Sequence, residues 1–296
     1  MQEAVSKKAI LYVFICILLW SLLSVFAKFA QTSLSNHQYL FYSSIISFLS
    51  VFAISIYTKK IKELFSYKLN TLLFLCFLGF LDYLFYLLLY FGYKYSNGLE
   101  VLVIQYTWPI FIVLFSVFIL KESLTKNRIF SLFFGFFGAV LIMTKGDIST
   151  IDLSNMKTIS LVLVAAASFA LFSVLSKKIK IDPINAVMLY FFVSVFYSFI
   201  SMNVFSNFVI PSKNELFFIF INGFFINGIS YIFWIKALQK LNASFVAPFI
   251  FLIPIISMFL LIIFFDEKVY FIYFVGLFFI IIAGLINTLT IKNKKI

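Results

Sequence analysis

The chain has 296 residues, of which 64% are hydrophobic and 11% are charged, and its mean hydropathy is +1.10. Soluble domains are about 45–50% apolar and about 25% charged, so this composition excludes an ordinary soluble domain and indicates an integral membrane protein. The net charge of +12 could suggest a nucleic-acid partner. The basic residues stand in short runs between apolar segments, as topology signals do, so we expect no nucleic acid among the partners.

The apolar residues fall into ten segments, each near the length of about 20 residues that a helix needs to cross a bilayer. In chain order we expect these spans at 9–29, 39–57, 70–92, 99–120, 128–144, 158–176, 184–205, 215–235, 243–265 and 269–290. The basic head before the first span resembles a signal peptide, but more spans follow it, so we interpret it as a retained first helix. The predicted fold class is all-α integral membrane with ten transmembrane helices.

The lysine and arginine residues predict the orientation of these spans. With the N-terminus in the cytoplasm, 17 of the 23 Lys and Arg residues fall on the inner side and 6 on the outer side. Basic residues gather in the short cytoplasmic loops of membrane proteins. We therefore expect a multi-pass protein of the plasma membrane with both termini in the cytoplasm.

The two halves of the chain resemble each other. The segment 19–28 (LWSLLSVFAK) is similar to 168–177 (SFALFSVLSK), and a polar linker around 145–157 separates the halves. At a slightly different offset, further pairs are Tyr86 with Tyr231, Asn97 with Asn242, Pro109 with Pro254, and Glu122 with Glu267. We expect a first five-helix repeat over 1–148 and a second over 149–296, which together form one transport unit.

An odd number of spans per repeat has a topological consequence. The second copy enters the membrane from the opposite side, so the two repeats are inverted relative to each other. Inverted repeats are typical of secondary transporters, whose solute site lies near the bilayer midplane between the repeats. The repeat therefore predicts a central cavity and transport by alternating access.

Polar side chains inside the spans are the candidates for solute contact. Trp20 and Ser24 in the first span could lie beside the cavity, although Ser24 could equally pack between helices. Asp82 lies near the middle of the third span, where a charged residue costs about 2.5–3.5 kcal/mol on insertion scales. Tyr86 and Tyr90 follow on the same helical face. This stripe could bind an ammonium group or relay a proton, and the alternative is a structural carboxylate bonded to neighbouring helices.

The fourth span contains the sequence QYTWP. Gln105 and Trp108 are three residues apart and share a face, and Pro109 removes a backbone donor. A broken helix at membrane depth is tolerated only against protein or a water-filled cavity. We interpret these residues as cavity-lining, and the alternative for Trp108 is an interfacial aromatic belt.

The second half contributes a matching set of candidates. They are Asn222, Asn227 and Tyr231 in the eighth span and Pro254, the repeat counterpart of Pro109, in the ninth. The alternative for the asparagines is hydrogen bonding between helices. Glu122 and Glu267 end the fourth and ninth spans, each beside a lysine. We interpret them first as solvated helix ends, and the alternative is a pair of gates on opposite faces of the membrane.

The residues for other chemistry are scarce. The cysteines, Cys16 and Cys76, fall inside apolar spans, and His37 is the one histidine. They offer no disulfide framework and no metal site, and no paired carboxylates or nucleotide-binding motif are present. We therefore expect no enzyme activity, metal or cofactor. The expected partners are a small-molecule solute and the lipid bilayer, with the chain a monomer or a weak homodimer.

The chain resembles the drug/metabolite transporter superfamily in its EamA-like branch. The resemblance rests on the ten spans, on the repeat, and on two copies of a Pro-to-Glu pattern, WPIFIVLFSVFILKES and IPIISMFLLIIFFDEK. It implies a basket of helices around a central cavity, with the fifth and tenth helices more peripheral. QYTWP also resembles the Asn-Tyr-Leu-Trp-Pro element of aromatic amino acid exporters. The second span reads QYLFYSSIISF and lacks the Arg that many relatives carry there, so no anion-binding base follows from the resemblance.

The expected function is a secondary transporter that exports a small metabolite, with amino acids as the first expectation. Three alternatives stay open. The same fold could carry an amine, a nucleoside or a lipid, the last as a flippase. The chain could also be a membrane enzyme, or a scaffold that transports nothing.

Overall fold

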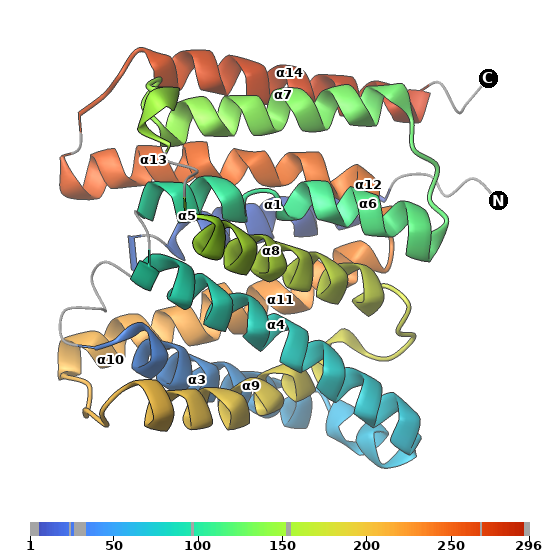
Figure 1. Ribbon diagram of the computed structural model, residues 1–296. Coiled ribbons are helices and arrows are strands. Elements are labelled where there is room, and N and C mark those ends of the chain that lie inside the picture. The colour runs from blue at the N-terminus through green and yellow to red at the C-terminus, as the bar shows by residue number, and fades with distance from the viewer. Residues whose placement is uncertain are drawn as a thin grey trace.

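Every regular element of the computed structural model is a helix over the residues it describes, which are 6–23, 25–26, 34–95, 98–151, 155–266 and 268–292 (Figure 1). The first half contains α1 (Lys7–Ser21), α3 (Asn36–Tyr57), η1 (Lys60–Ser66), α4 (Leu69–Tyr95), α5 (Gly98–Gln105), α6 (Trp108–Leu120) and α7 (Lys126–Met143). The second half contains η2 (Ile148–Thr150), α8 (Met156–Ser176), α9 (Pro183–Phe205), α10 (Lys213–Ile221), η3 (Asn222–Ile229), α11 (Ser230–Leu238), α12 (Ala243–Val246), η4 (Ala247–Phe251), α13 (Leu252–Phe265) and α14 (Ile272–Lys292).

Within the described ranges, nine helical stretches are long and apolar enough to cross a bilayer. They coincide with the second to tenth expected spans. Helix α1 is described over 15 residues, and the rest of the first expected span includes residues outside the described ranges. The all-helical membrane class is therefore confirmed, and a tenth span and the inversion of the repeats stay predictions.

Capping residues set where two of the spanning helices begin. Ser35 Oγ accepts a hydrogen bond from Gln38 N at 3.3 Å, and Gln38 Oε1 accepts one from Ser35 N at 2.7 Å. Ser212 and Glu215 repeat this reciprocal arrangement at 3.3 and 2.8 Å before α10. Such capping boxes satisfy amide groups that the first helical turn leaves free.

Three spans are interrupted inside the membrane. Helix α5 ends at Gln105 and α6 begins at Trp108, just before Pro109, which cannot donate to the carbonyl of Gln105. The ninth span passes through the 3₁₀ segment η4, and the eighth through the π-helix η3. The eighth span is therefore irregular where its two asparagines lie. Such π-segments frequently lie at functional sites.

Helices α7 and α14 lie side by side along the upper edge of the bundle in Figure 1. Their backbones approach closely where Gly138 faces Gly276, because a Cβ atom on either glycine would lie under 3 Å from the other's carbonyl oxygen. Ser131 Oγ also donates to the carbonyl of Ala283 at 2.6 Å. The fifth and tenth helices therefore form one pair at an edge, as the resemblance implies.

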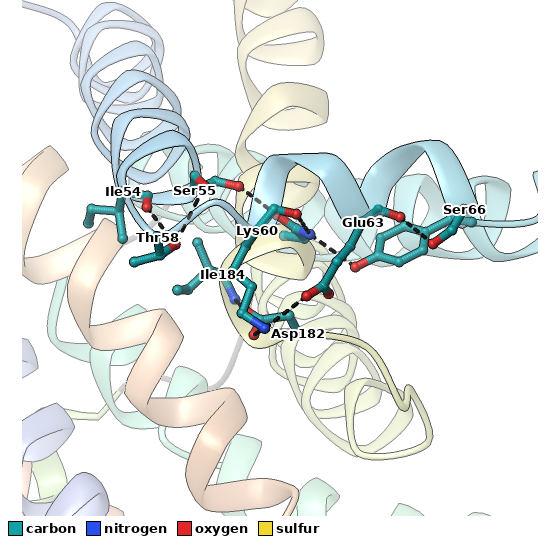
Figure 2. A network of polar contacts seen from close by, with 10 residues as sticks. Ile54, Ser55, Thr58, Lys60, Glu63, Ser66, Asp182 and Ile184 are labelled. Atoms are coloured by element: carbon teal, nitrogen blue, oxygen red, sulfur yellow. Dashed lines mark hydrogen bonds and ion pairs between the residues drawn. The ribbon is translucent and has the colours of Figure 1, made fainter.

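A polar network joins the two halves where η1 meets the start of α9 (Figure 2). Lys60 Nζ lies 2.8 Å from Glu63 Oε1 and 3.3 Å from Asp182 Oδ2, and these hydrogen bonds raise the pKa of Lys60. Ser55 Oγ donates to Asn185 Oδ1 at 2.7 Å, and Asn185 Nδ2 donates to the carbonyl of Lys60 at 2.8 Å. The connection between α3 and α4 is thereby fastened to the start of α9.

Candidate functional site

Asp82 lies in the interior, near the middle of α4, with a fully buried side chain. Its Oδ1 accepts a hydrogen bond from the hydroxyl of Tyr231 in α11 at 2.8 Å. Its Oδ2 is buried and has no hydrogen-bond partner among the described residues. A buried carboxylate oxygen without a partner is costly, so within the described part of the chain this oxygen indicates a ligand site.

Two tyrosines continue from Asp82 along α4. The hydroxyls of Tyr86 and Tyr231 lie 3.3 Å apart, and these are residues that the internal repeat pairs with each other. Since Tyr231 donates its proton to Asp82, Tyr86 donates to Tyr231. The rings of Tyr86 and Tyr90 lie 6.5 Å apart, and Tyr90 lies 5.9 Å from the ring of His37. Tyr86 and Tyr90 are partly buried, so a polar row runs from Asp82 toward the start of α3.

An aromatic cluster borders the carboxylate, and its members come from four helices. They are Trp20 (α1), Trp108 (α6), Phe169 (α8), and Tyr231 and Trp234 (α11). The ring of Trp20 lies 6.2, 6.2, 6.1 and 5.1 Å from those of Trp108, Phe169, Tyr231 and Trp234, respectively. The cluster holds all three tryptophans of the chain. Trp108 is 5% exposed in this cluster, so its interpretation as an interfacial belt residue is wrong.

Serine hydroxyls fix two of these indole rings. Trp20 Nε1 donates to Ser230 Oγ at 2.8 Å, and Ser230 Oγ donates to the carbonyl of Ile226. Trp234 Nε1 donates to Ser173 Oγ at 3.1 Å. Trp234 was not among the candidates, although its position three residues after Tyr231 places both on one helical face. Nothing in the sequence indicated Phe169 or Ser230.

Other candidates lie apart from this cluster. Asn222 and Asn227 are buried in η3, and Asn222 Oδ1 lacks a hydrogen-bond partner within the described part of the chain. Gln105 is partly buried at the end of α5, where the described residues give it no polar side-chain partner. No hydrogen bond or ion pair between described residues joins these three residues to Asp82. Pro109 and Pro254 are buried in the first turns of α6 and α13, and Ser24 and Glu267 lie outside the described residues.

Glu122 joins the end of α6 to the start of α12. Its Oε1 accepts from Ala243 N at 2.9 Å, and its Oε2 accepts from Ser244 N at 2.9 Å and from Ser244 Oγ at 2.5 Å. Lys177 Nζ, at the end of α8, lies 3.8 Å from Oε1. We call these four residues the Glu122 latch. The Glu122 side chain is 6% exposed, so its interpretation as a solvated helix end is wrong.

The latch has further supports from both halves. Lys177 Nζ donates to the carbonyl of Leu238 at 2.9 Å and to that of Leu241. Arg128 Nη1 donates to the carbonyl of Ser123 at 2.7 Å and to Ser244 Oγ. The Glu122 carboxylate accepts hydrogen bonds from two backbone amides that the start of a helix leaves without a partner inside the helix. The helix dipole also favours negative charge at this end. This arrangement holds α6, α8 and α12 together at one end of the bundle.

Known proteins resemble this chain in sequence and in fold. The model of the EamA-like transporter family matches residues 7–144 and 156–289. A solved crystal structure of a protein with 17% sequence identity has the same fold, with a TM-score of 0.86 over 96% of this chain and 98% of that one.

Two relatives come from Bacillus subtilis (strain 168). The uncharacterized transporter YyaM is 26% identical over 181 residues, which are 58% of this chain and 58% of YyaM. The uncharacterized transporter YoaV is 26% identical over 219 residues, 71% of this chain and 73% of YoaV. An uncharacterized transporter of Acidianus ambivalens is 26% identical over 170 residues, which are 56% of this chain and 64% of that protein. The family match covers nearly the whole chain, which is therefore a multi-pass membrane protein and belongs to the EamA-like transporter family.

Proposed function

We propose that the protein is a secondary transporter that exports a small nitrogen-containing metabolite, an amino acid or an amine, across the plasma membrane. Its two halves are inverted five-helix repeats, and both termini lie in the cytoplasm. The single observation that carries the proposal is the buried carboxylate of Asp82. Its Oδ1 accepts a hydrogen bond from Tyr231 of the other half, and its Oδ2 has no described partner. An ionisable residue inside a membrane is by default a functional one.

The positions of these residues in both halves support transport by alternating access. Asp82, Trp20 and Trp108 belong to the first half, and Tyr231 and Phe169 belong to the second. A solute bound between them therefore contacts both halves, and a rocking of one half against the other changes the side from which it can enter. Rocking of repeats around a fixed site is the common mechanism of secondary transporters.

The Glu122 latch and the Lys60 network are the proposed closure on the cytoplasmic side. Both join the two halves at the end of the bundle where the basic residues gather. Opening toward the cytoplasm separates Glu122 from Ala243 and Ser244, which exposes the two amides and the carboxylate to water. Water then replaces the lost hydrogen bonds, so the net cost of opening is modest.

The driving force comes from a gradient. The chain carries no nucleotide-binding motif, so an ion or the solute itself supplies the energy. A carboxylate can hold either a proton or a cationic group, and it therefore offers a simple exchange of one for the other.

Counterflow in proteoliposomes tests this proposal. Vesicles containing the purified protein are loaded with one unlabelled solute from a panel of amino acids, amines and nucleosides, and uptake of the labelled solute is followed. We expect transient accumulation of at least one nitrogen-containing solute, which Asp82→Asn weakens. Vesicles that exchange no member of the panel would contradict the proposal.

A lipid flippase is the second candidate. A groove of about 400 Å³ between α6 and α7 is lined only by apolar side chains, among them Leu114, Phe118 and Phe133. A groove of this kind suits an acyl chain. Movement of a fluorescent phospholipid between the leaflets of the same vesicles, at a rate that depends on the protein, would favour this candidate.

A further inference from the structure

We infer that the site between the two halves takes organic amines without a carboxylate in preference to amino acids. The inference rests on the proposed function and deepens it, because it selects one solute class. Three features of the site support it. They are the Asp82 Oδ2 that has no described partner, the nearby donors that are used in internal hydrogen bonds, and the aromatic cluster beside them.

The charge of the site favours a cationic solute. Asp82 takes part in none of the ion pairs between described residues, which instead involve Lys60 and Lys177 at one end of the bundle. No member of the aromatic cluster is basic, and His37 lies beyond Tyr90. The described part of the site thus presents one carboxylate and no cation beside it. An ammonium group matches this charge, whereas an α-carboxylate brings a second anion without a counter-charge.

The hydrogen-bond donors beside Asp82 do not suit an anionic solute. A carboxylate solute needs N–H or O–H groups that are free to point at it. Tyr86 donates to Tyr231, and Tyr231 donates to Asp82. The indoles of Trp20 and Trp234 donate to Ser230 and Ser173. These four donors are therefore already used within the protein.

One indole donor is not used in a hydrogen bond within the described protein. The N–H of Trp108 has no described partner, so it can bond a hydroxyl or another neutral acceptor on the solute. Neutral donors of this kind do not compensate a full negative charge. The oxygen that is free to bind is an acceptor, Asp82 Oδ2, and it suits the N–H groups of an ammonium.

The aromatic cluster favours an apolar or aromatic body on the solute. The rings of Trp20, Trp108, Phe169 and Trp234 lie within 5.0 to 6.2 Å of their neighbours, and Tyr231 belongs to both the ring cluster and the Asp82 hydrogen bond. Aromatic faces attract cations and pack well against apolar groups. The cluster therefore offers aromatic contacts to an amine on an apolar or aromatic body.

Three probes with the same phenyl body separate the solute classes. Phenethylamine carries only the ammonium, phenylalanine carries both charges, and 3-phenylpropionate carries only the carboxylate. Because all three tryptophans of the chain belong to the aromatic cluster, intrinsic tryptophan fluorescence reports on this site directly. We expect phenethylamine to bind at least about tenfold more tightly than phenylalanine, since buried groups left unpaired discriminate strongly. 3-Phenylpropionate should give no saturable change.

Two variants assign the preference to Asp82. Asp82→Asn should remove the difference between phenethylamine and phenylalanine. Glu215→Gln is the matched control, because Glu215 is a buried carboxylate in a capping box, where glutamine also functions. It should keep the wild-type preference. Equal or tighter binding of phenylalanine by the wild type, a response to none of the probes, or a preference that persists in Asp82→Asn would overturn the inference.

Counterflow of the same probes separates this inference from the proposed function. Exchange of phenylalanine without any preference for the amine would overturn the inference and leave the transport function standing. Amine-selective fluorescence without exchange of any probe would overturn the transport function and leave the amine site standing.

Discussion

Tyr231 donates its hydroxyl proton to Asp82 Oδ1 at 2.8 Å, across 149 positions of sequence and across the boundary between the two halves of the chain. The same hydroxyl lies 3.3 Å from that of Tyr86, its partner in the internal repeat. The three side chains therefore form one donor chain that ends on the carboxylate. In the proposed alternating access, movement of the halves relative to each other changes this chain and thereby couples the site to conformation.

The donor chain predicts unequal effects for its two tyrosines. Tyr231→Phe removes the donor to Asp82 and the acceptor of Tyr86, so we expect a loss of about 1–3 kcal/mol in unfolding free energy. Tyr86→Phe removes only the outer member and should cost less. Thermal unfolding in detergent compares the two variants. Equal losses would contradict the donor chain.

The Glu122 latch predicts a change in accessibility. Glu122→Ala leaves two backbone amides and the hydroxyl of Ser244 without their acceptor, so the contact between α6 and α12 should loosen. A single cysteine in place of the buried Ser176 should then react with an impermeant thiol reagent added from the cytoplasmic side.

The control for this experiment is Lys121→Ala, because Lys121 is exposed and takes no part in the latch. Both variants are compared in a background in which Cys16 and Cys76 are replaced by alanine. The latch would be refuted by a cysteine at Ser176 that reacts at the same rate with and without Glu122→Ala.

The glycines of α14 predict opposite results for two substitutions. A Cβ atom at Gly276 would lie 2.5 Å from Ile142 and 2.8 Å from the carbonyl of Gly138, so Gly276→Val should separate α7 from α14. At Gly284 a Cβ atom would meet nothing within 4 Å, and Gly284→Ala should be neutral or stabilising by up to about 1 kcal/mol. Unfolding midpoints of both variants test the pair, and a larger loss for Gly284→Ala would exclude this packing.

Much of the fold could be predicted because the signals for it are local. Apolar length predicted ten spans, of which the described residues contain nine, and Pro109 stands where α5 and α6 separate. The inward face of each helix could not be predicted, because lipid-facing side chains are as apolar as buried ones. Phe133, for example, is 64% exposed on α7. An amphipathic pattern of the kind seen in soluble helices is therefore missing.

The site was predictable only in part, for the same reason. A charged residue in the middle of an apolar span is evident in the sequence, and Asp82 could therefore be singled out. The partners of Glu122 lie 121 and 122 positions away in sequence, and the neighbouring lysine instead suggested a solvated end. Phe169 gave no signal, because one phenylalanine among 44 carries no positional information.

Topology is testable with two surface serines. Both Ser149, before α8, and Ser66, at the end of η1, are exposed. With the N-terminus in the cytoplasm, a cysteine at Ser149 should be labelled from outside intact cells, and one at Ser66 only after permeabilisation. The cysteine-free background again removes Cys16 and Cys76. The reverse pattern of labelling would invert the orientation.

The most direct test of the central claim is solute exchange in proteoliposomes, measured against external pH for the wild type, Asp82→Asn and His37→Gln with matched amounts of protein. His37→Gln is the control for the other titratable side chain near the tyrosine row. We predict that protons compete with the solute in the wild type and in His37→Gln. Asp82→Asn should bind solute at least about tenfold more weakly and lose the pH dependence, because a neutral amide cannot hold a cation or a proton. If Asp82→Asn exchanges solute with wild-type affinity and an unchanged pH profile, the carboxylate between the halves is only structural, and the account is wrong.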